Sequence, residues 1–291
     1  MVQFRWWQSL PLALLLAGGC LARPALKVLI VDGQNNHAWR ETTPVLKKIL
    51  EETGQFQVDV ATTPPAGSDM REFKPDFAAY QVVLVNYNGD PWSDETKAAF
   101  EKYVQDGGGV VIYHAADNAF PEWKAYNQMI AVGGWGNRTT DQFGKVAHFR
   151  NGKVFLDAGS RKCGNHGQRL PFQVTMRDPG HPIAKGLPLV WMHAGDELYD
   201  GLCGPAEHLD VIGTAHSLET NHGTDQNEPM LMSIRYGKGR IFHTTLGHDV
   251  AAMRCAGFIA TLQRGTEWAA TGKVTQKVPK DFPGPDQVRV R

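Results

Sequence analysis

The chain has 291 residues, and its 30 Lys and Arg residues balance 30 Asp and Glu residues, so the formal net charge is zero. Without a global excess of positive charge, the composition argues against a protein that binds nucleic acid through its phosphates. With 42% hydrophobic and 21% charged residues, the chain has the composition of a globular protein and not of a disordered one.

The first 20 residues resemble a secretory signal peptide. Arg5 supplies a positive charge ahead of an apolar run at residues 10–17. This run is far shorter than the ~20 apolar residues that cross a bilayer, so we expect no membrane span. Residues 16–20 (Leu-Ala-Gly-Gly-Cys) resemble a lipobox, in which Cys20 would carry a lipid anchor, and plain cleavage after Ala22 or Ala25 is the alternative. Either ending predicts an exported protein, periplasmic or on the cell surface.

The first half of the remaining chain alternates short apolar strands with amphipathic helices. Strands are expected at residues 26–31, 56–60, 82–85 and 109–113. Thr43 and Pro44 are expected to start one helix and Ser93 another, and Gly54 and Gly107 are expected to end them. Such alternation is typical of a parallel sheet with helices on both faces.

The second half is less regular. The periodicity fails over residues 115–169, where glycines are frequent, so we expect a loop-rich insertion. Further strands are expected at 172–176, 208–215, 230–234 and 240–244, and a last helix at 249–263. We therefore predict one domain over residues 26–270, preceded by the signal (1–20) and followed by a loosely ordered extension (271–291).

The cysteines fit an oxidising compartment. Cys163 and Cys203 both lie in Gly-rich segments and could form a disulfide. Cys255 lies in an apolar helical run, which favours a buried thiol. No CxxC spacing occurs, so the sequence does not indicate a structural zinc site.

Polar and aromatic residues concentrate where the predicted strands end. In open α/β sheets, ligands bind outside the carboxyl ends of the strands. Four segments follow such ends and carry Asn35, Asn36, His37 and Trp39; His114; His193, Asp196, Glu197 and Tyr199; and His248 and Asp249. Imidazoles beside carboxylates can relay protons near neutral pH or hold Zn²⁺ or a similar metal with an open position.

Simpler interpretations exist for the same residues. A histidine after a strand is more often bonded to loop backbone than catalytic. Asp249 can be the N-cap of the last helix, and Trp39, Trp135 and Trp191 can belong to the core. His166 and His222 lie in polar loops and could join a site.

Several common functional motifs are missing from the sequence. No GxGxxG follows the first strand and no GxxxxGK[ST] occurs, which argues against a nucleotide-phosphate site. There is no GxSxG, and the position after the 109–113 strand holds His114 instead of a nucleophilic Ser or Cys.

Four segments together resemble the ThuA-like (trehalose utilisation) family. They are residues 32–39, residues 107–115 (Gly-Gly-Gly-Val-Val-Ile-Tyr-His-Ala), the His-x-x-Asp-Glu-x-Tyr pattern within 191–199, and residues 236–249. The resemblance covers approximately residues 27–268. It implies an α/β fold, a flavodoxin-like or class I glutamine amidotransferase-like three-layer sandwich with a mostly parallel sheet.

The resemblance also bears on activity. It implies that His114 stands where the amidotransferase cysteine would be, and since imidazole there cannot form the thioester, we expect no glutaminase activity. Family members are linked to the breakdown of disaccharides and glycosides, some through 3-keto-sugar intermediates.

We therefore hypothesise a carbohydrate-processing enzyme acting on a glycoside or 3-keto-glycoside. His114 or His37 would be the base, with Glu197 or Asp196 and His248 as acid, orienting group or metal ligand. The sugar would be bound by Asn35, Asn36, Trp39, Trp135 and Tyr199. A divalent metal, if bound, would be held by His193 and His248.

Two other functions fit the same sequence. One is a non-catalytic domain that binds carbohydrate or takes part in cell-surface interactions, on an amidotransferase fold that has lost its nucleophile. The other is metal-assisted hydrolysis of an ester or amide.

Overall fold

The computed structural model describes residues 1–3 and 24–291, so Cys20 and most of the predicted signal peptide lie outside the described residues. The strands of the large sheet are β1 (Leu26–Asp32), β2 (Phe56–Thr62), β3 (Val82–Val85), β4 (Gly109–Tyr113), β8 (Leu170–Met176), β9 (Val190–Asp196), β12 (Leu209–Ser217), β13 (Gln226–Tyr236) and β14 (Gly239–Thr244). Two small sheets contain β5 (Lys145–Arg150), β6 (Lys153–Asp157), β7 (Asn165–His166), β10 (Tyr199–Asp200) and β11 (Cys203–Gly204). The α-helices are α1 (Trp39–Glu51), α2 (Asp94–Gln105), α3 (Lys124–Ile130), α4 (Thr140–Phe143), α5 (Val250–Met253) and α6 (Ala256–Thr271).

The large sheet is mixed, and the expectation of a mostly parallel sheet is not confirmed. Its order is β2-β1-β3-β4-β14-β13-β12-β8-β9. The pairs from β2 to β14 are parallel, whereas those from β14 to β9 are antiparallel. The physical reason lies in the connections, because the short Tyr236–Gly239 turn between β13 and β14 can join only antiparallel neighbours.

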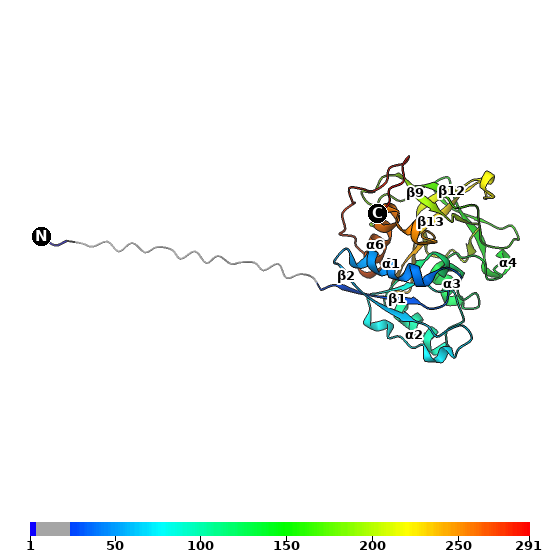
Figure 1. Cartoon of the computed structure of the whole chain (residues 1–291), viewed down its shortest axis with the longest axis horizontal. Helices are drawn as coiled ribbons and strands as arrows, with labels where there is room; N and C mark the ends of the chain where they lie inside the picture. Colours follow the sequence, from blue (N-terminus) through cyan, green and yellow to red (C-terminus); the bar gives the residue numbers. More distant parts are fainter. Residues whose placement is uncertain (4–23) are drawn as a thin grey trace.

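Helices cover both faces of the sheet, as expected for a three-layer α/β fold. One core packs α1 and α6 against the sheet through Leu46, Leu50, Phe258 and Leu262. The other core packs α2 and α3 against the opposite face, and all four residues of β3 are fully buried between the two cores. Figure 1 shows α1 and α6 side by side, in agreement with their contacts.

Two helix boundaries differ from those expected. Helix α1 begins at Trp39, one turn before Thr43, and Pro44 lies inside it. The Thr43 hydroxyl is therefore free to bond the Asn86 side chain (3.0 Å) and does not cap the helix. The predicted last helix is two helices, because the chain turns at Cys255 between α5 and α6.

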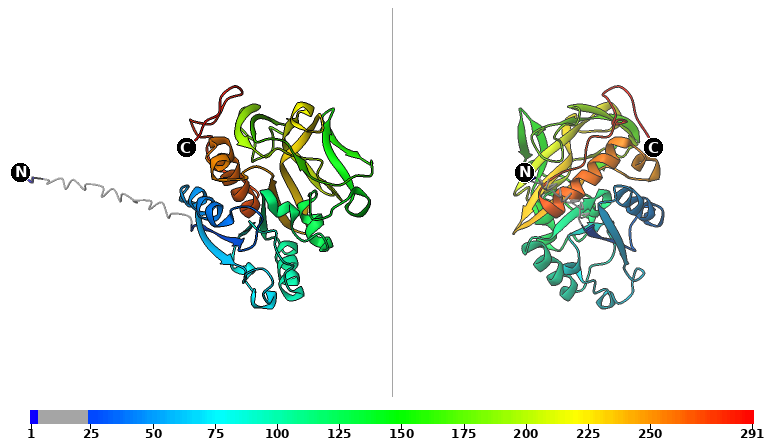
Figure 2. Two further views of the ribbon diagram at one scale, coloured as in Figure 1. Left: turned by 45° about the vertical axis from the view of Figure 1, so that its right-hand side comes forward. Right: turned by 90° about the vertical axis from the view of Figure 1, so that its left-hand side faces the viewer.

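The insertion and the C-terminal tail are more ordered than expected. The insertion contains helices α3 and α4 and strands β5–β7. In Figure 2 these strands are drawn in green and lie far from α1 and β2. Cys163 and Cys203 form a disulfide, and Cys255 is a buried free thiol. The tail packs Val278 and Phe282 against the core, although it has almost no regular structure. Within the described residues, every helix is too short or too polar to cross a membrane.

Candidate active site

Five chain segments deliver polar side chains to one edge of the sheet. His37 follows β1, Asn88 follows β3, His114 follows β4 and His248 follows β14, all at the carboxyl ends of parallel strands. Glu197 follows β9, which runs in the same direction as β14 because four antiparallel pairings separate the two.

Curvature of the sheet brings β9 back to this edge. β9 lies four strand positions from β14, which is roughly 19 Å in a flat sheet. Nevertheless, the backbone N–H of Gly247 donates to Asp196 Oδ2 at 2.6 Å, and that of His248 donates to Asp196 Oδ1 at 3.0 Å. The buried Asp196 carboxylate therefore ties the end of β9 to the loop after β14.

His114 sits in a strained turn at the end of β4. Its φ of +45° is in the left-handed region, which a residue with a Cβ adopts only when its surroundings hold it there. The ring is fixed on both sides, since Nδ1 lies 2.6 Å from the Thr245 carbonyl oxygen and Nε2 lies 2.9 Å from the Tyr199 hydroxyl. A carbonyl oxygen can only accept, so Nδ1 carries the proton and Nε2 presents its lone pair.

Three imidazoles surround the Glu197 carboxylate. Glu197 Oε2 lies 3.0 Å from His248 Nδ1, 3.7 Å from His114 Nε2 and 3.8 Å from His37 Nε2. Its other oxygen, Oε1, lies 3.6 Å from His166 Nε2. The Nδ1 of His37 faces the side-chain oxygens of Asn35 and Asn36, which again leaves Nε2 directed at the carboxylate.

The pKa shifts follow from this packing. Burial alone would raise the pKa of Glu197, but the surrounding imidazoles of His114, His248 and His37 outweigh it and hold that pKa below its usual value. Burial lowers the pKa of His37. Burial would also lower the pKa of His114, but the nearby carboxylates of Glu197 and Asp196 leave that pKa raised. Burial also raises the pKa of the Tyr199 phenol well above its usual value, so its hydroxyl stays protonated.

A second, fully buried ion pair lies behind these groups. His193 Nε2 is 2.7 Å from Asp196 Oδ2, and neither side chain is exposed. Burial opposes the charge on His193, but the bond to Asp196 prevails and raises the pKa of His193 to about 9. Asp196 also accepts from the backbone N–H of Glu197 at 2.9 Å. The pair thus positions Glu197 and the Gly247–His248 loop and does not itself face the pocket.

The four side chains His37, His114, Glu197 and His248 are suited to bind one divalent metal ion. Each offers one ligand atom, and these atoms lie within 4.8 Å of one another. Two ligands bound at 2.0–2.1 Å to the same ion are about 3.0–3.4 Å apart, so small side-chain movements would complete the site. Nitrogen lone pairs fixed by Nδ1–H bonds to oxygen, as in His37 and His114, are typical of metal-binding histidines.

A pocket of about 590 Å³ opens over this cluster. It is lined by Asn36, His37, Ala38, Asn88, Asn118, Trp135, Gly136, His166, Glu197, Tyr199, His248 and Asp249. Its volume is in the range of small-molecule sites. Neither Lys nor Arg occurs among these described lining residues, whereas amides and aromatic rings do.

The structure brings together most, but not all, of the residues expected at the site. His193 lies behind the cluster, so the expected metal pair of His193 and His248 is not formed, and His248 instead meets His37, His114 and Glu197. Asp196 is likewise buried behind the pocket. Asn35 contacts His37 from outside the pocket, and Trp39 packs under Arg40 and does not line it.

Among the polar residues that line the pocket, Asn88 and Asn118 had no predicted role, and His166 was expected only as a loop residue that could join a site. Asn88 follows β3, Asn118 ends the turn after β4, and His166 pairs with Tyr199 between the two-residue strands β7 and β10. The sequence signal for His166 was only its polar loop. The position of His166 depends on the pairing of β7 with β10. This pairing joins residues 33 positions apart, so it exists only in the folded chain.

Comparisons with known proteins agree with this architecture. The ThuA family model, described as trehalose utilisation, matches residues 27–269. A ThuA-like protein from Parabacteroides merdae is 47% identical, with 92% of this chain and 98% of that chain covered and a TM-score of 0.90. Another from Bacteroides uniformis, 19% identical with 87% and 94% covered and a TM-score of 0.59, shows the fold alone. No protein with a curated description matches the sequence. The chain therefore belongs to the ThuA (trehalose utilisation) family, which has a class I glutamine amidotransferase-like fold.

Proposed function

We propose that this protein is an exported carbohydrate-processing enzyme that cleaves a glycoside or 3-keto-glycoside with the help of a bound divalent metal. The observation that carries the proposal is the convergence of His37, His248 and Glu197, which line the pocket, with His114 directly beneath them. Three imidazoles and one carboxylate would leave positions open for substrate on an ion that takes five or six ligands, as catalytic metal sites require.

The pocket lining favours an uncharged substrate. A phosphorylated or acidic sugar would call for Lys or Arg, and the described lining residues include neither. Asn36, Asn88 and Asn118 can exchange hydrogen bonds with hydroxyl groups, and the half-buried Trp135 offers aromatic surface. This combination suits a neutral sugar.

The reaction we propose is elimination across C1 and C2 of a 3-keto-sugar. The ketone acidifies the hydrogen at C2, so a base can remove that proton. The electron pair then forms the C1–C2 double bond, the bond from C1 to the departing oxygen breaks, and that oxygen takes up a proton. A bound metal would supply Lewis acidity towards the ketone oxygen. No oxidant is consumed, because the substrate is already oxidised at C3.

Two residues on the pocket wall can move these protons. His166 is the base we favour, because its side chain is 37% exposed, whereas that of His114 is only 2% exposed. The Tyr199 hydroxyl, which stays protonated, can donate to the departing oxygen. His114 then serves as a ligand and not as the base.

Export is supported by the cysteines. The Cys163–Cys203 disulfide is a bond that persists in oxidising compartments and is rare in reducing ones. Mass spectrometry of the mature N-terminus, together with fractionation of the producing cells, tests export and shows whether Cys20 carries lipid.

The activity is tested with purified protein loaded with Zn²⁺ or Mn²⁺ and incubated with 3-keto-trehalose, trehalose or p-nitrophenyl acetate. We expect only 3-keto-trehalose to be consumed, with release of glucose and the ultraviolet absorbance of a conjugated enone. Trehalose that binds without turnover of any substrate would instead support a non-catalytic binding domain. Ester cleavage alone would support a hydrolase, and either result would contradict the proposal.

A matched pair of variants separates the site from general stability. Glu197→Gln should lower Zn²⁺ affinity at least about 100-fold and abolish turnover. Glu228→Gln is the control, because Glu228 is also buried beside a histidine, with Oε1 2.9 Å from His148 Nδ1, but does not line the pocket. Equal metal binding by both variants would refute the assignment of the centre.

A further inference from the structure

An aromatic row runs from the pocket wall to the proposed metal ligands. The ring centroids of Trp135 and Tyr199 lie 4.4 Å apart, and those of Tyr199 and His114 also lie 4.4 Å apart. Trp135 is half-buried and lines the pocket, whereas His114 lies beneath it. A molecule resting on Trp135 would therefore be one aromatic ring away from the metal ligands.

The backbone at Trp135 is in a conformation that its surroundings must hold. Its φ is +51°, in the left-handed region that disfavours a residue with a large side chain. The Trp135 N–H donates to the carbonyl oxygen of Cys163 at 2.8 Å. Two residues earlier, Gly133 exchanges both backbone hydrogen bonds with Cys203, at 2.9 and 3.0 Å. The segment 133–135 is thus hydrogen-bonded to both cysteines of the disulfide, to Cys203 through Gly133 and to Cys163 through Trp135.

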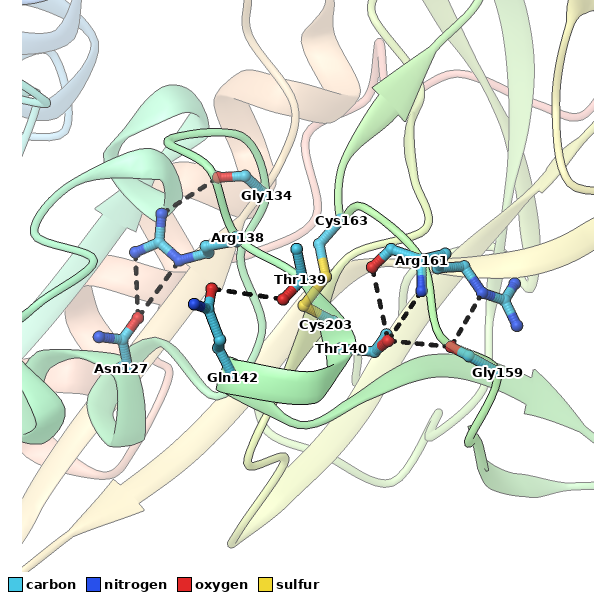
Figure 3. The surroundings of a disulfide bond; sticks show 10 residues. All are labelled: Asn127, Gly134, Arg138, Thr139, Thr140, Gln142, Gly159, Arg161, Cys163 and Cys203. Carbon is cyan, nitrogen blue, oxygen red and sulfur yellow. Dashed lines mark hydrogen bonds between the residues drawn. A yellow bond between two sulfur atoms is a disulfide. The ribbon is translucent and has the colours of Figure 1, made fainter.

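Further contacts complete this support. Figure 3 shows Arg138 beside the disulfide, and its guanidinium donates to the Gly134 carbonyl at 3.1 Å and to Asn127 Oδ1 at 3.0 Å. Arg138 is 1% exposed. On the other side, the backbone of Gly164 lies against the indole so closely that a Cβ there would be 2.7 Å from Trp135 Cε3. The indole therefore packs against the chain immediately after Cys163.

We propose that Trp135, backed by the buried ring of Tyr199, forms a subsite for the apolar face of a neutral sugar ring, and that the Cys163–Cys203 disulfide positions Trp135 in it. The inference rests on the proposed carbohydrate function and names the residues that select its substrate. The disulfide joins positions 40 residues apart. Without it, the two segments that bond Gly133 and Trp135 lose their covalent link and are held together by weaker contacts, namely the β7–β10 pairing and the bond from the Gly164 N–H to the Gly201 carbonyl oxygen at 3.0 Å.

The test measures binding of trehalose to the zinc-loaded full-length protein by calorimetry, with the acyclic polyol sorbitol as the ligand that lacks a ring. Trp135→Ala should weaken trehalose binding about 3- to 10-fold, and Trp135→Phe should weaken it less. The Cys163→Ala/Cys203→Ala double variant should weaken it to a similar extent. Zinc affinity should remain that of the wild type in all three, because none of these residues contacts the metal ligands through hydrogen bonds. With 3-keto-trehalose, KM should rise while kcat changes little.

Two glycine variants provide a second test of the positioning of Trp135, in case the cysteine variant fails to fold. Gly164→Ala should weaken trehalose binding, because the added Cβ would displace the indole. Gly152→Ala is its control, since Gly152 also has a positive φ (+77°) in the same insertion but has open space around it. Equal trehalose binding by these two variants would overturn the positioning of Trp135 by its neighbours.

The remaining outcomes separate this inference from the proposed function. If wild type turns over 3-keto-trehalose and Trp135→Ala has the same KM and trehalose affinity, the subsite is refuted and the proposed function stands. If the folded cysteine variant binds trehalose like wild type, the role of the disulfide is refuted. If wild type binds no sugar at all while zinc binds, both the function and the subsite are refuted.

Discussion

Asp196 is the residue whose replacement should damage the site most, although it never reaches the pocket. Its carboxylate is 1% exposed and accepts four hydrogen bonds. Oδ2 accepts from Gly247 N–H and His193 Nε2, and Oδ1 accepts from the N–H groups of Glu197 and His248. In Asp196→Asn, either orientation of the amide would point its NH₂ group at two donors.

The magnitude follows from this arrangement. Removing one partner of a buried ion pair costs about 3–5 kcal/mol, because the other charge is left without compensation. Here the charge left is that of His193, which is fully buried. For a domain of this size, we therefore expect Asp196→Asn to lower Tm by roughly 6–20 °C. Zinc affinity should fall as well, since Glu197 and His248 lose their backbone anchor.

The pH dependence gives a second signature. The pKa of His193 is raised from 6.5 to about 9 in the folded protein. A raised pKa stabilises the fold fully below pH 6.5, and this contribution is lost as the pH rises from 6.5 through 9. The shift corresponds to about 3 kcal/mol. Wild type should therefore lose about this much stability between pH 6 and pH 9.5, and Asp196→Asn should lose much less.

Urea unfolding of metal-free protein at both pH values tests this reasoning. The control is Asp225→Asn, because Asp225 also pairs with a histidine (Oδ1 3.1 Å from His216 Nε2) but at the surface, where such pairs contribute little. If Asp196→Asn and Asp225→Asn unfold alike, or if wild type shows no alkaline loss, the buried ion pair does not have the role assigned here.

Three further predictions concern the disulfide, a turn and the metal. Cys163→Ala/Cys203→Ala should destabilise the protein by about 4 kcal/mol, the chain-entropy value for a 40-residue loop, and unchanged unfolding in urea would contradict this. Gly247→Ala should lower Tm more than Gly54→Ala in thermal melts, because both have positive φ but only at Gly247 would a Cβ meet Phe258, at 2.7 Å. Chelating a metal present at 100 times its Kd should remove about 2.7 kcal/mol of stability in the same melts, and Glu197→Gln should show no such effect.

Much of the fold was predictable from local pattern. The four parallel strands β1 to β4, the Ser93 cap of α2 and the Asp249 cap of α5 were expected and are present. These features depend on hydrophobic periodicity and on the short-range hydrogen bonds of cap residues, which neighbouring residues alone determine. The start of α1 was placed incorrectly, because Thr43 bonds to Asn86, a residue 43 positions away.

The site was predictable in part, for the same reason. Because parallel strands end at one edge of the sheet, His37, His114 and His248 could be placed together from the order of strands and loops. The sequence alone thus determined the strand-end histidines and the family.

Only the tertiary structure decided which groups surround Glu197. The antiparallel half of the sheet curves back so that Asp196 bonds Gly247, and this directs His193 away from the cluster and brings His166 to the pocket. Sheet curvature and the pairing of two-residue strands both result from many weak contacts between residues that are far apart in the sequence. No local sequence pattern predicts the combined effect of such contacts, so only the folded chain shows which residues form the site.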